Sequence, residues 1–306
     1  MKLLQRKQWA TTPAFVNQLF NLPLTLTLTL FIFISATISF SIHAKTLQES
    51  FSASPGGGLQ VKTDAGKINV TTHNNPTILV KVEIDGQDQD DFSVEFIPKN
   101  GNLQIIGDRY NKNNNWRWSK QLRVSFNITV PSKYNVQLST AGGSLRIEDL
   151  IGNVDIHTSG GSIDLGNISG DVQAKTSGGT IKAGNINGNV LLYTSGGSIK
   201  VGEVQGELSA KTSGGSIKAT FAQQITQNTE LKTSGGSIEA TLPAQIRVDL
   251  KASTSGGRVS SDFLVNGEIS KRKIEGKING GGPKLILHTS GGSVKIRKNN
   301  NINNLM

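Results

Sequence analysis

The chain has 306 residues, of which 35 are glycine, none is cysteine, 18% are charged and only 6% are aromatic. Without a thiol it cannot form a disulfide framework, an iron–sulfur cluster, a thiolate zinc site or a cysteine nucleophile. The glycines follow no Gly-X-Y period, which excludes collagen, and the aliphatic residues are too regularly placed for a disordered chain. The net charge of +10 bears on association and solubility and identifies no partner.

Residues 1–44 have the composition of a secretory signal peptide. Three basic residues precede an apolar stretch over residues 22–42, and the small residue Ala44 closes the segment. Because the apolar run approaches the roughly 20 residues that a spanning helix needs, an uncleaved N-terminal membrane anchor is the alternative. Cleavage would lower the net charge to +7 and place the chain in the periplasm, at the cell surface or in the extracellular medium.

Residues 45–138 are predicted to form a β-rich N-terminal cap. Residues 59–70 look like a degenerate copy of the repeat that follows. Strand-like runs separated by polar turns then occupy residues 77–84, 92–97, 103–106 and 122–130. Such a cap would cover one open end of the repeat array, which otherwise exposes an unpaired edge.

Two polar segments of this cap are candidate ligand sites. Residues 85–91 carry four acids, but the order of an EF-hand loop and its later glutamate are missing, so a polar hairpin loop is favoured over calcium binding. Residues 111–120 place two tryptophans among polar and basic residues, where they would stack on sugar rings, sit at a membrane interface or fold back to plug the array. The candidate ligand-binding residues of this loop are Trp116, Arg117, Trp118 and Lys120.

From residue 139 the sequence is built on a repeated Thr-Ser-Gly-Gly, preceded by one Thr-Ala-Gly-Gly variant at Thr140. The first five of these eight starts are 18 residues apart, and the later spacings are 21, 21 and 35. The repeat starts at Thr158, Thr176, Thr194, Thr212, Thr233, Thr254 and Thr289. A fixed short period predicts a solenoid in which each repeat is one coil stacked on the last.

Within one repeat, apolar and polar residues alternate in two short runs. Ile163 and Leu165 share one parity, and Val172, Ala174 and Thr176 share it in the second run, which predicts two half-buried strands and no helix. About four aliphatic side chains cannot offset the ordering entropy of a separate coil, so the coils must stack ~4.8 Å apart and share an interior.

The predicted fold is therefore all-β. It is a β-solenoid, or single-stranded β-helix, of about 18-residue coils over residues 139–298, followed by an asparagine-rich disordered tail over residues 299–306. The paired glycines are expected to turn the chain by adopting positive φ, which only glycine enters without steric cost. The longer spacings place their extra residues at the second corner, in residues 221–228 and 242–247.

Three sequence segments carry a resemblance to a known family. They are the run from Val124 to Ile147, the repeated T-S-G-G-S-I, and the closing run from Leu285 to Ile296. Together they resemble the bacterial putative-adhesin family of β-strand-repeat proteins, a domain of unknown function. The likeness covers residues 51–297 and implies an exported or envelope-associated β-solenoid. It brings no catalytic residues that could be transferred to this chain.

The repeat also aligns basic residues on its predicted outer faces. Lys182, Lys200 and Lys218 occupy equivalent positions in successive coils, and a second set precedes the corner at Lys175, Lys211 and Lys232. Such a stripe would hold a phosphorylated or carboxylated polysaccharide, although a solvated face is the simpler interpretation because lysines ~4.8 Å apart repel weakly in water. The threonines have inward parity, which argues against an ice-binding face.

No catalytic constellation emerges from the sequence. The serines lie in repeated corners, the acids are scattered one per coil, and His157 and His288 occupy an exposed slot that elsewhere holds lysine, tyrosine or serine. We therefore expect a non-enzymatic, exported, adhesin-like binding or structural protein of the bacterial cell envelope, without cofactor or metal.

Its expected partners are an anionic polysaccharide or envelope proteins; nucleic acid is not expected, and a membrane is expected only if the leader is retained. The alternatives are an envelope scaffold or regulatory component and a polysaccharide-active β-helix enzyme.

Overall fold

The computed structural model describes residues 44–86, 89–110 and 122–299. The predicted leader, the tryptophan loop with Trp116, Arg117, Trp118 and Lys120, and the tail beyond residue 299 lie outside the described residues. In the described part, no helix is long and apolar enough to cross a membrane.

The described residues form three sheets together with a short 3₁₀ turn, η1 (Gln89–Asp91). Sheet A contains, in spatial order, β1 (Lys45–Ser52), β4 (Thr77–Asp85), β7 (Arg123–Pro131), β3 (Lys67–His73), β9 (Leu145–Ile147), β12 (Ile163–Leu165), β15 (Ile181–Ala183), β18 (Ile199–Val201), β20 (Ile217–Thr220), β22 (Ile238–Pro243), β28 (Val294–Asn299) and β24 (Val259–Ser261).

Sheet B contains β25 (Asn266–Ile269), β26 (Lys273–Ile278), β23 (Val248–Thr254), β27 (Lys284–Thr289), β21 (Thr229–Thr233), β19 (Leu208–Thr212), β17 (Val190–Thr194), β14 (Val172–Thr176), β11 (Val154–Thr158), β8 (Asn135–Thr140), β2 (Gly58–Thr63), β6 (Asn102–Arg109) and β5 (Phe92–Lys99). Sheet C contains β10 (Leu150–Ile151), β13 (Ile168–Ser169) and β16 (Ile186–Asn187).

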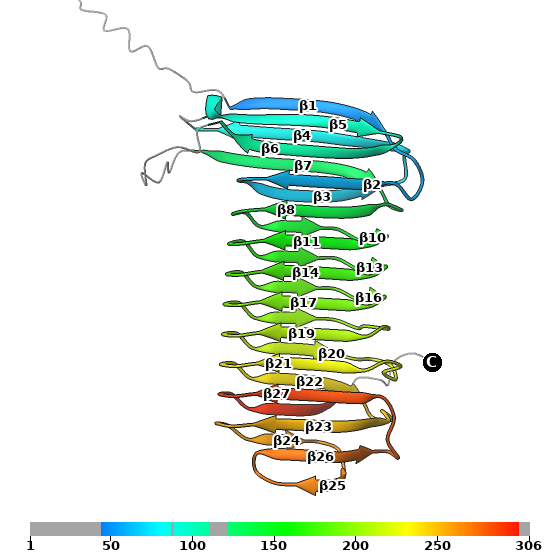
Figure 1. Cartoon of the computed structure of the whole chain (residues 1–306). Helices are drawn as coiled ribbons and strands as arrows, with labels where there is room; N and C mark the ends of the chain where they lie inside the picture. Colours follow the sequence, from blue (N-terminus) through cyan, green and yellow to red (C-terminus); the bar gives the residue numbers. More distant parts are fainter. Residues whose placement is uncertain (1–43, 87–88, 111–121, 300–306) are drawn as a thin grey trace, which may run out of the picture. The chain divides into compact units, whose positions relative to one another are not determined.

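Successive coils pair in parallel at the 18-residue offset, which confirms the predicted β-solenoid. Val154 of β11 lies opposite Val172 of β14, and Ile163 of β12 lies opposite Ile181 of β15. Figure 1 shows β8, β11, β14, β17 and β19 as successive rungs of the same face. Because the offset equals the repeat length, residues at equivalent positions of the repeat form columns that run from coil to coil.

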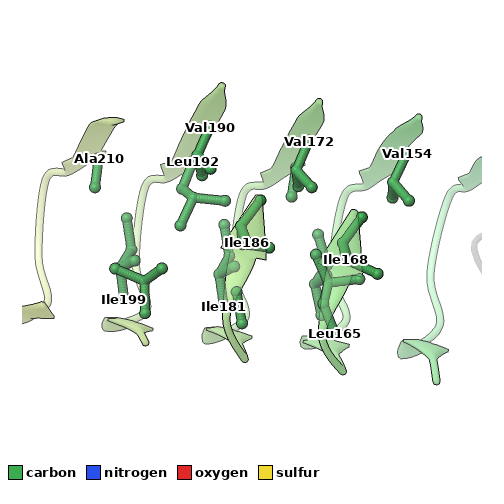
Figure 2. Packing of buried hydrophobic residues seen from close by; sticks show 14 of the residues in the cluster. Val154, Leu165, Ile168, Val172, Ile181, Ile186, Val190, Leu192, Ile199 and Ala210 are labelled. Atoms are coloured by element: carbon green, nitrogen blue, oxygen red, sulfur yellow. The ribbon is translucent and has the colours of Figure 1, made fainter. Parts of the chain in front are cut away.

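The interior of the coils is a continuous aliphatic column. Figure 2 shows Val154, Val172 and Val190 side by side on successive coils, opposite Ile168 and Ile186. Each of these five side chains is at most 3% exposed. The alternating burial of β14, in which Val172, Ala174 and Thr176 are buried, confirms the predicted inward parity.

The prediction of two strands per coil was incomplete. In three coils the second corner itself forms a two-residue strand, so that β10, β13 and β16 pair in parallel as sheet C. Ile168 and Ile186 point inward from these strands and fill the corner. The isolated bridge between Ile186 and Val204 carries this contact one coil further.

The last repeat of the sequence does not lie at the end of the stack. In sheet B, β27 lies between β21 and β23 (Figure 1), and in sheet A, the strand order places β28 between β22 and β24. The coil that begins with β27 therefore follows the coil of Thr233 in space, although the coil of Thr254 follows Thr233 in sequence. Beyond β23, the antiparallel strands β26 and β25 complete sheet B.

The N-terminal part contains a complete coil, as the degenerate copy of the repeat predicted. β2 pairs in parallel with β8, and β3 pairs in parallel with β9, so residues 58–73 add one rung to both sheets. β7, β4 and β1 then extend sheet A, while β6 and β5 extend sheet B. Phe92 and Phe126, one from each sheet, are buried with ring centroids 6.5 Å apart and fill the interior at this end.

Each Thr-Ser-Gly-Gly corner is tied to the neighbouring coil by its threonine. The Thr176 hydroxyl donates to the carbonyl oxygen of Gly161 in the preceding coil at 2.8 Å and accepts from the amide of Gly179 at 3.3 Å. These hydrogen bonds also follow the spatial order of the coils where it differs from the sequence order. The Thr289 hydroxyl donates to the carbonyl oxygen of Gly236, and the Thr254 hydroxyl donates to the carbonyl oxygen of Gly292. The inward threonine thus satisfies backbone groups that the turn leaves free.

The corner glycines are required for a reason other than the predicted one. All of them are described, and none has φ in the left-handed region, whereas Gly152 and Gly170 of the second corner do, at 152° and 154°. A Cβ on Gly143 would instead lie 1.9 Å from the carbonyl oxygen of Gly66 in the adjacent coil. The second glycine is therefore required by the close approach of two backbones.

We predict that Gly143→Ala lowers the free energy of unfolding by about 1–3 kcal/mol or more, because the added methyl meets rigid backbone. The matched control is Gly142→Ala in the same corner, where a Cβ meets nothing within 4 Å. That variant should stay within about 0.5 kcal/mol of the parent. Urea denaturation measures both, and equal losses for the two variants would contradict the explanation.

We also predict that Thr194→Val costs about 1–3 kcal/mol, because the partly buried carbonyl of Gly179 and the amide of Gly197 both lose their side-chain partner. Thr180→Val is the control, since the Thr180 hydroxyl has no hydrogen-bond partner among the described residues. Thermal unfolding of both variants provides the comparison. A Thr194→Val protein as stable as the control would exclude an energetic role for the threonine column.

Candidate functional site

The predicted lysine stripe is a straight column on the outer face of sheet A. Lys182, Lys200 and Lys218 lie directly opposite one another on β15, β18 and β20, and we call them the lysine ladder. Asp164 precedes the ladder and Glu239 follows it in the same column. All three lysines are exposed, because the period-2 alternation that buries Ile181 and Ala183 turns Lys182 outward.

Among the described residues, two of the three lysines of the ladder, Lys182 and Lys200, carry unpaired charge. Arg146 binds Asp164 at 3.0 Å, and Lys218 binds Glu239 at 2.7 Å. The hydrogen bond from Lys218 and its positive charge hold the pKa of Glu239 below its ordinary value, against the effect of partial burial. Among the described residues, Lys182 and Lys200 form no ion pair, so two adjacent ammonium groups remain available to an anion.

The second basic set lies on the outer face of sheet B. Lys175, Tyr193, Lys211 and Lys232 are successive members of one column, with the ammonium of Lys175 5.6 Å from the ring centroid of Tyr193. Glu230 accepts hydrogen bonds from both Lys211 and Lys232, and these contacts lower its pKa. This set is therefore partly neutralised.

The other predicted ligand residues do not gather into a site. His157 and His288 belong to the column of Lys175 and lie three or more strands apart, and His288 Nδ1 is 2.9 Å from the Ser253 hydroxyl. In the acidic turn, Asp85 binds Arg123 at 2.8 Å. In the described part of the chain, no three His, Asp or Glu side chains are grouped so that they could hold a metal ion.

Sequence reasoning missed a groove on the outer face of sheet B. It encloses about 960 Å³ and crosses the beginnings of β2, β6, β8, β11, β14, β17 and β19 together with the end of β5. We call it the amide groove, because most of its polar side chains are carboxamides. Its carboxamide residues are Gln60, Gln104, Gln137, Gln173, Asn102, Asn135, Asn153 and Asn189.

Two parallel columns build the amide groove. The outward column on the strands contains Gln60, Gln137, Asp155 and Gln173 in register, and then Leu191. The second column lies at the corner, where each side chain binds the next coil. Its members Asn135, Asn153, Asp171 and Asn189 each accept a hydrogen bond from the backbone amide of the residue 18 positions later. The 18-residue spacing of these polar residues was the signal that could have revealed both columns.

The hydrogen bonds of the amide groove leave many polar groups free. Gln60 donates to Gln137 at 2.9 Å, and Gln137 donates to Asp155 at 3.4 Å. Within the described residues, the side-chain amides of Gln104 and Gln173 have no partner, and the same holds for the Nδ2 groups of Asn153 and Asn189. The groove therefore presents both donors and acceptors to a ligand.

The strand that precedes the tryptophan loop in sequence contributes its other end to the groove. The groove is lined by the first residues of β6, Asn102 to Gln104, whereas the loop follows the last residue of β6, Arg109. The position of Trp116 and Trp118 lies outside the described residues.

Solved structures of three bacterial proteins are similar to this chain at low sequence identity. A putative adhesin from Bacteroides fragilis is 14% identical over 83% of this chain and 97% of that chain, with a TM-score of 0.45. A putative adhesin from Parabacteroides distasonis is 15% identical over 83% and 98%, with a TM-score of 0.38. A putative cell adhesion protein from Clostridium sporogenes is 15% identical over 83% and 100%, with a TM-score of 0.32.

No curated protein matches the chain. The family model described as Toastrack DUF4097 matches residues 57–297, nearly the whole described region. This agrees with the resemblance to a putative-adhesin family of unknown function that the repeat motifs indicated. The chain belongs to the Toastrack DUF4097 family.

Proposed function

We propose that the protein is a non-enzymatic, exported, adhesin-like binding protein of the bacterial cell envelope, and that its lysine ladder binds an anionic polysaccharide. The observation that carries the proposal is the register of sheet A, which aligns equivalent exposed side chains from coil to coil. A polymer with regularly spaced carboxylates or phosphates could contact several rungs at once. Such a contact gains affinity from multiple weak interactions without a deep pocket.

The charges of the column support an anionic ligand at its centre. Lys182 and Lys200 are adjacent, exposed and without an ion-pair partner in the described residues, so an anion need not displace an existing carboxylate. Lys218 shares its charge with Glu239 and contributes less. The exposed position of the ladder implies strong screening by salt.

A second candidate function is an envelope scaffold that binds partner proteins, and a specific edge favours it. β1 is the outermost strand of sheet A and pairs with β4 on one side, while no described strand pairs with its other side. β4 itself has no free edge, because it pairs with β1 on one side and seven of its nine residues pair with β7 on the other. An unpaired edge can accept a strand from another chain.

The proposal predicts that Lys182→Gln with Lys200→Gln and Lys218→Gln weakens binding to a soluble carboxylated polysaccharide roughly tenfold at low salt, because each exposed ion pair contributes under about 1 kcal/mol. Isothermal titration calorimetry measures the affinity, and added salt should reduce it for the parent protein. Trp116→Ala with Trp118→Ala tests the tryptophan loop in the same assay.

The matched control replaces Lys175, Lys211 and Lys232 of sheet B by glutamine. It removes the same net charge from another face and should retain most of the affinity. Equal losses for the two triple variants would show a general charge effect and would count against the ladder. Binding of an envelope protein without any affinity for polysaccharide would favour the scaffold, and turnover of a polysaccharide would reveal an enzyme.

A further inference from the structure

The amide groove is separate from the lysine ladder, because the two lie on the outer faces of different sheets. It crosses eight neighbouring strands, from β5 to β19, which corresponds to a length of ~34 Å at the spacing of β-strands. Its volume of about 960 Å³ is at the upper end of the range for small-molecule sites. A groove of this length suits an extended chain better than a compact ligand.

The charge of the amide groove excludes the ligand class assigned to the ladder. Three carboxylates, those of Asp155, Asp171 and Glu207, line it against the single ammonium of Lys99. None of the four forms an ion pair with a described residue. An anionic polysaccharide or nucleic acid would meet net repulsion here, and it would gain little from one lysine at the end of the groove.

The backbone of the groove offers little scope for strand addition. From β6 to β19, every strand that the groove crosses is paired on both sides in sheet B. β5 is the edge strand of sheet B, but only residues near its end, Ile97 and Lys99, line the groove, so a peptide in the groove would bind mainly through side chains. The aliphatic side chains of the groove that are not buried are Ile97 of β5 and Leu191 of β17, which lie near opposite ends of the groove and therefore form no continuous channel for a lipid chain.

The side chains of the groove fit a polyhydroxylated ligand. A carboxamide both donates and accepts hydrogen bonds, as does a sugar hydroxyl, so rows of carboxamides can match hydroxyls whichever way each one points. The side-chain amides of Gln104 and Gln173 and the Nδ2 groups of Asn153 and Asn189 have no partner among the described residues, whereas the Oδ1 atoms of the two asparagines accept backbone hydrogen bonds. Leu191, 46% exposed and placed in the column after Gln173, supplies an apolar contact for the C–H face of a sugar ring.

We propose that the amide groove binds an uncharged glycan chain, whose hydroxyl or acetamido groups pair with the carboxamides of successive coils. The glycan would run across the strands, since the groove is continuous in that direction. This site does not depend on the proposed role of the lysine ladder. A protein with both sites would connect a neutral and an anionic polymer.

The test uses the full chain and a panel of soluble β-linked glucose and N-acetylglucosamine oligosaccharides, with a carboxylated polysaccharide and a cationic glucosamine polymer as charged probes. Gln60→Ala with Gln137→Ala and Gln173→Ala removes three carboxamides of the outward column. We expect the Kd for the neutral oligosaccharide to rise about tenfold or more, since each neutral hydrogen bond contributes modestly. High salt should leave the binding of the parent protein unchanged, because the ligand carries no charge.

The matched control is Asn187→Ala with Gln205→Ala and Gln227→Ala, which removes three exposed carboxamides outside the groove. It should bind as the parent does, and circular dichroism should show that both variants are folded. The lysine-ladder triple variant should also retain the neutral ligand, which separates this proposal from the previous one. The proposal is wrong if no neutral oligosaccharide binds, if the groove variant binds as tightly as the parent, or if the groove prefers the cationic polymer.

Discussion

The structure depends on the parallel pairing of each coil with the next at a fixed offset of 18 residues. A coil cannot satisfy its own backbone groups, because the amides and carbonyls of its strands point along the stack toward the neighbouring coils. The threonine of each corner follows the same rule, since the Thr176 hydroxyl binds a carbonyl of the preceding coil. Stability therefore comes from contacts between coils and not from any coil alone.

The same offset makes the outer surfaces. Because equivalent positions stack directly, a single residue type repeated every 18 positions becomes a continuous feature of the surface. Repeated lysine gives the ladder from Lys182 to Lys218, and repeated glutamine and asparagine give the amide groove. The close stacking also restricts the corners, where the carbonyl oxygen of Gly66 leaves no space for a side chain at Gly143. The 18-residue offset therefore determines both the stacking of the coils and the candidate binding surfaces.

The sequence predicted the features that depend on periodicity and missed those that depend on long-range order. The inward parity of Thr176 and the outward alignment of Lys182 with Lys200 follow from alternation and repeat length alone. The placement of β27 between β21 and β23 does not, because all corner motifs look alike and the antiparallel hairpin of β25 and β26 intervenes. The amide groove was missed because its residues vary between glutamine, asparagine and aspartate and share only their spacing.

The parallel pairing implies that one coil can replace another in the stack, provided that the 18-residue register is kept. Deleting residues 177–194 removes one whole coil and joins Thr176 to the next Ser-Gly-Gly, whereas deleting residues 176–194 removes one residue more and breaks the register. We expect the first variant to keep cooperative unfolding and an all-β circular dichroism spectrum. The second should lose at least about 2 kcal/mol more in urea denaturation, because a one-residue slip turns buried side chains outward. Equal stabilities for the two deletions, or an unfolded first variant, would show that the 18-residue register does not determine the stability of the stack.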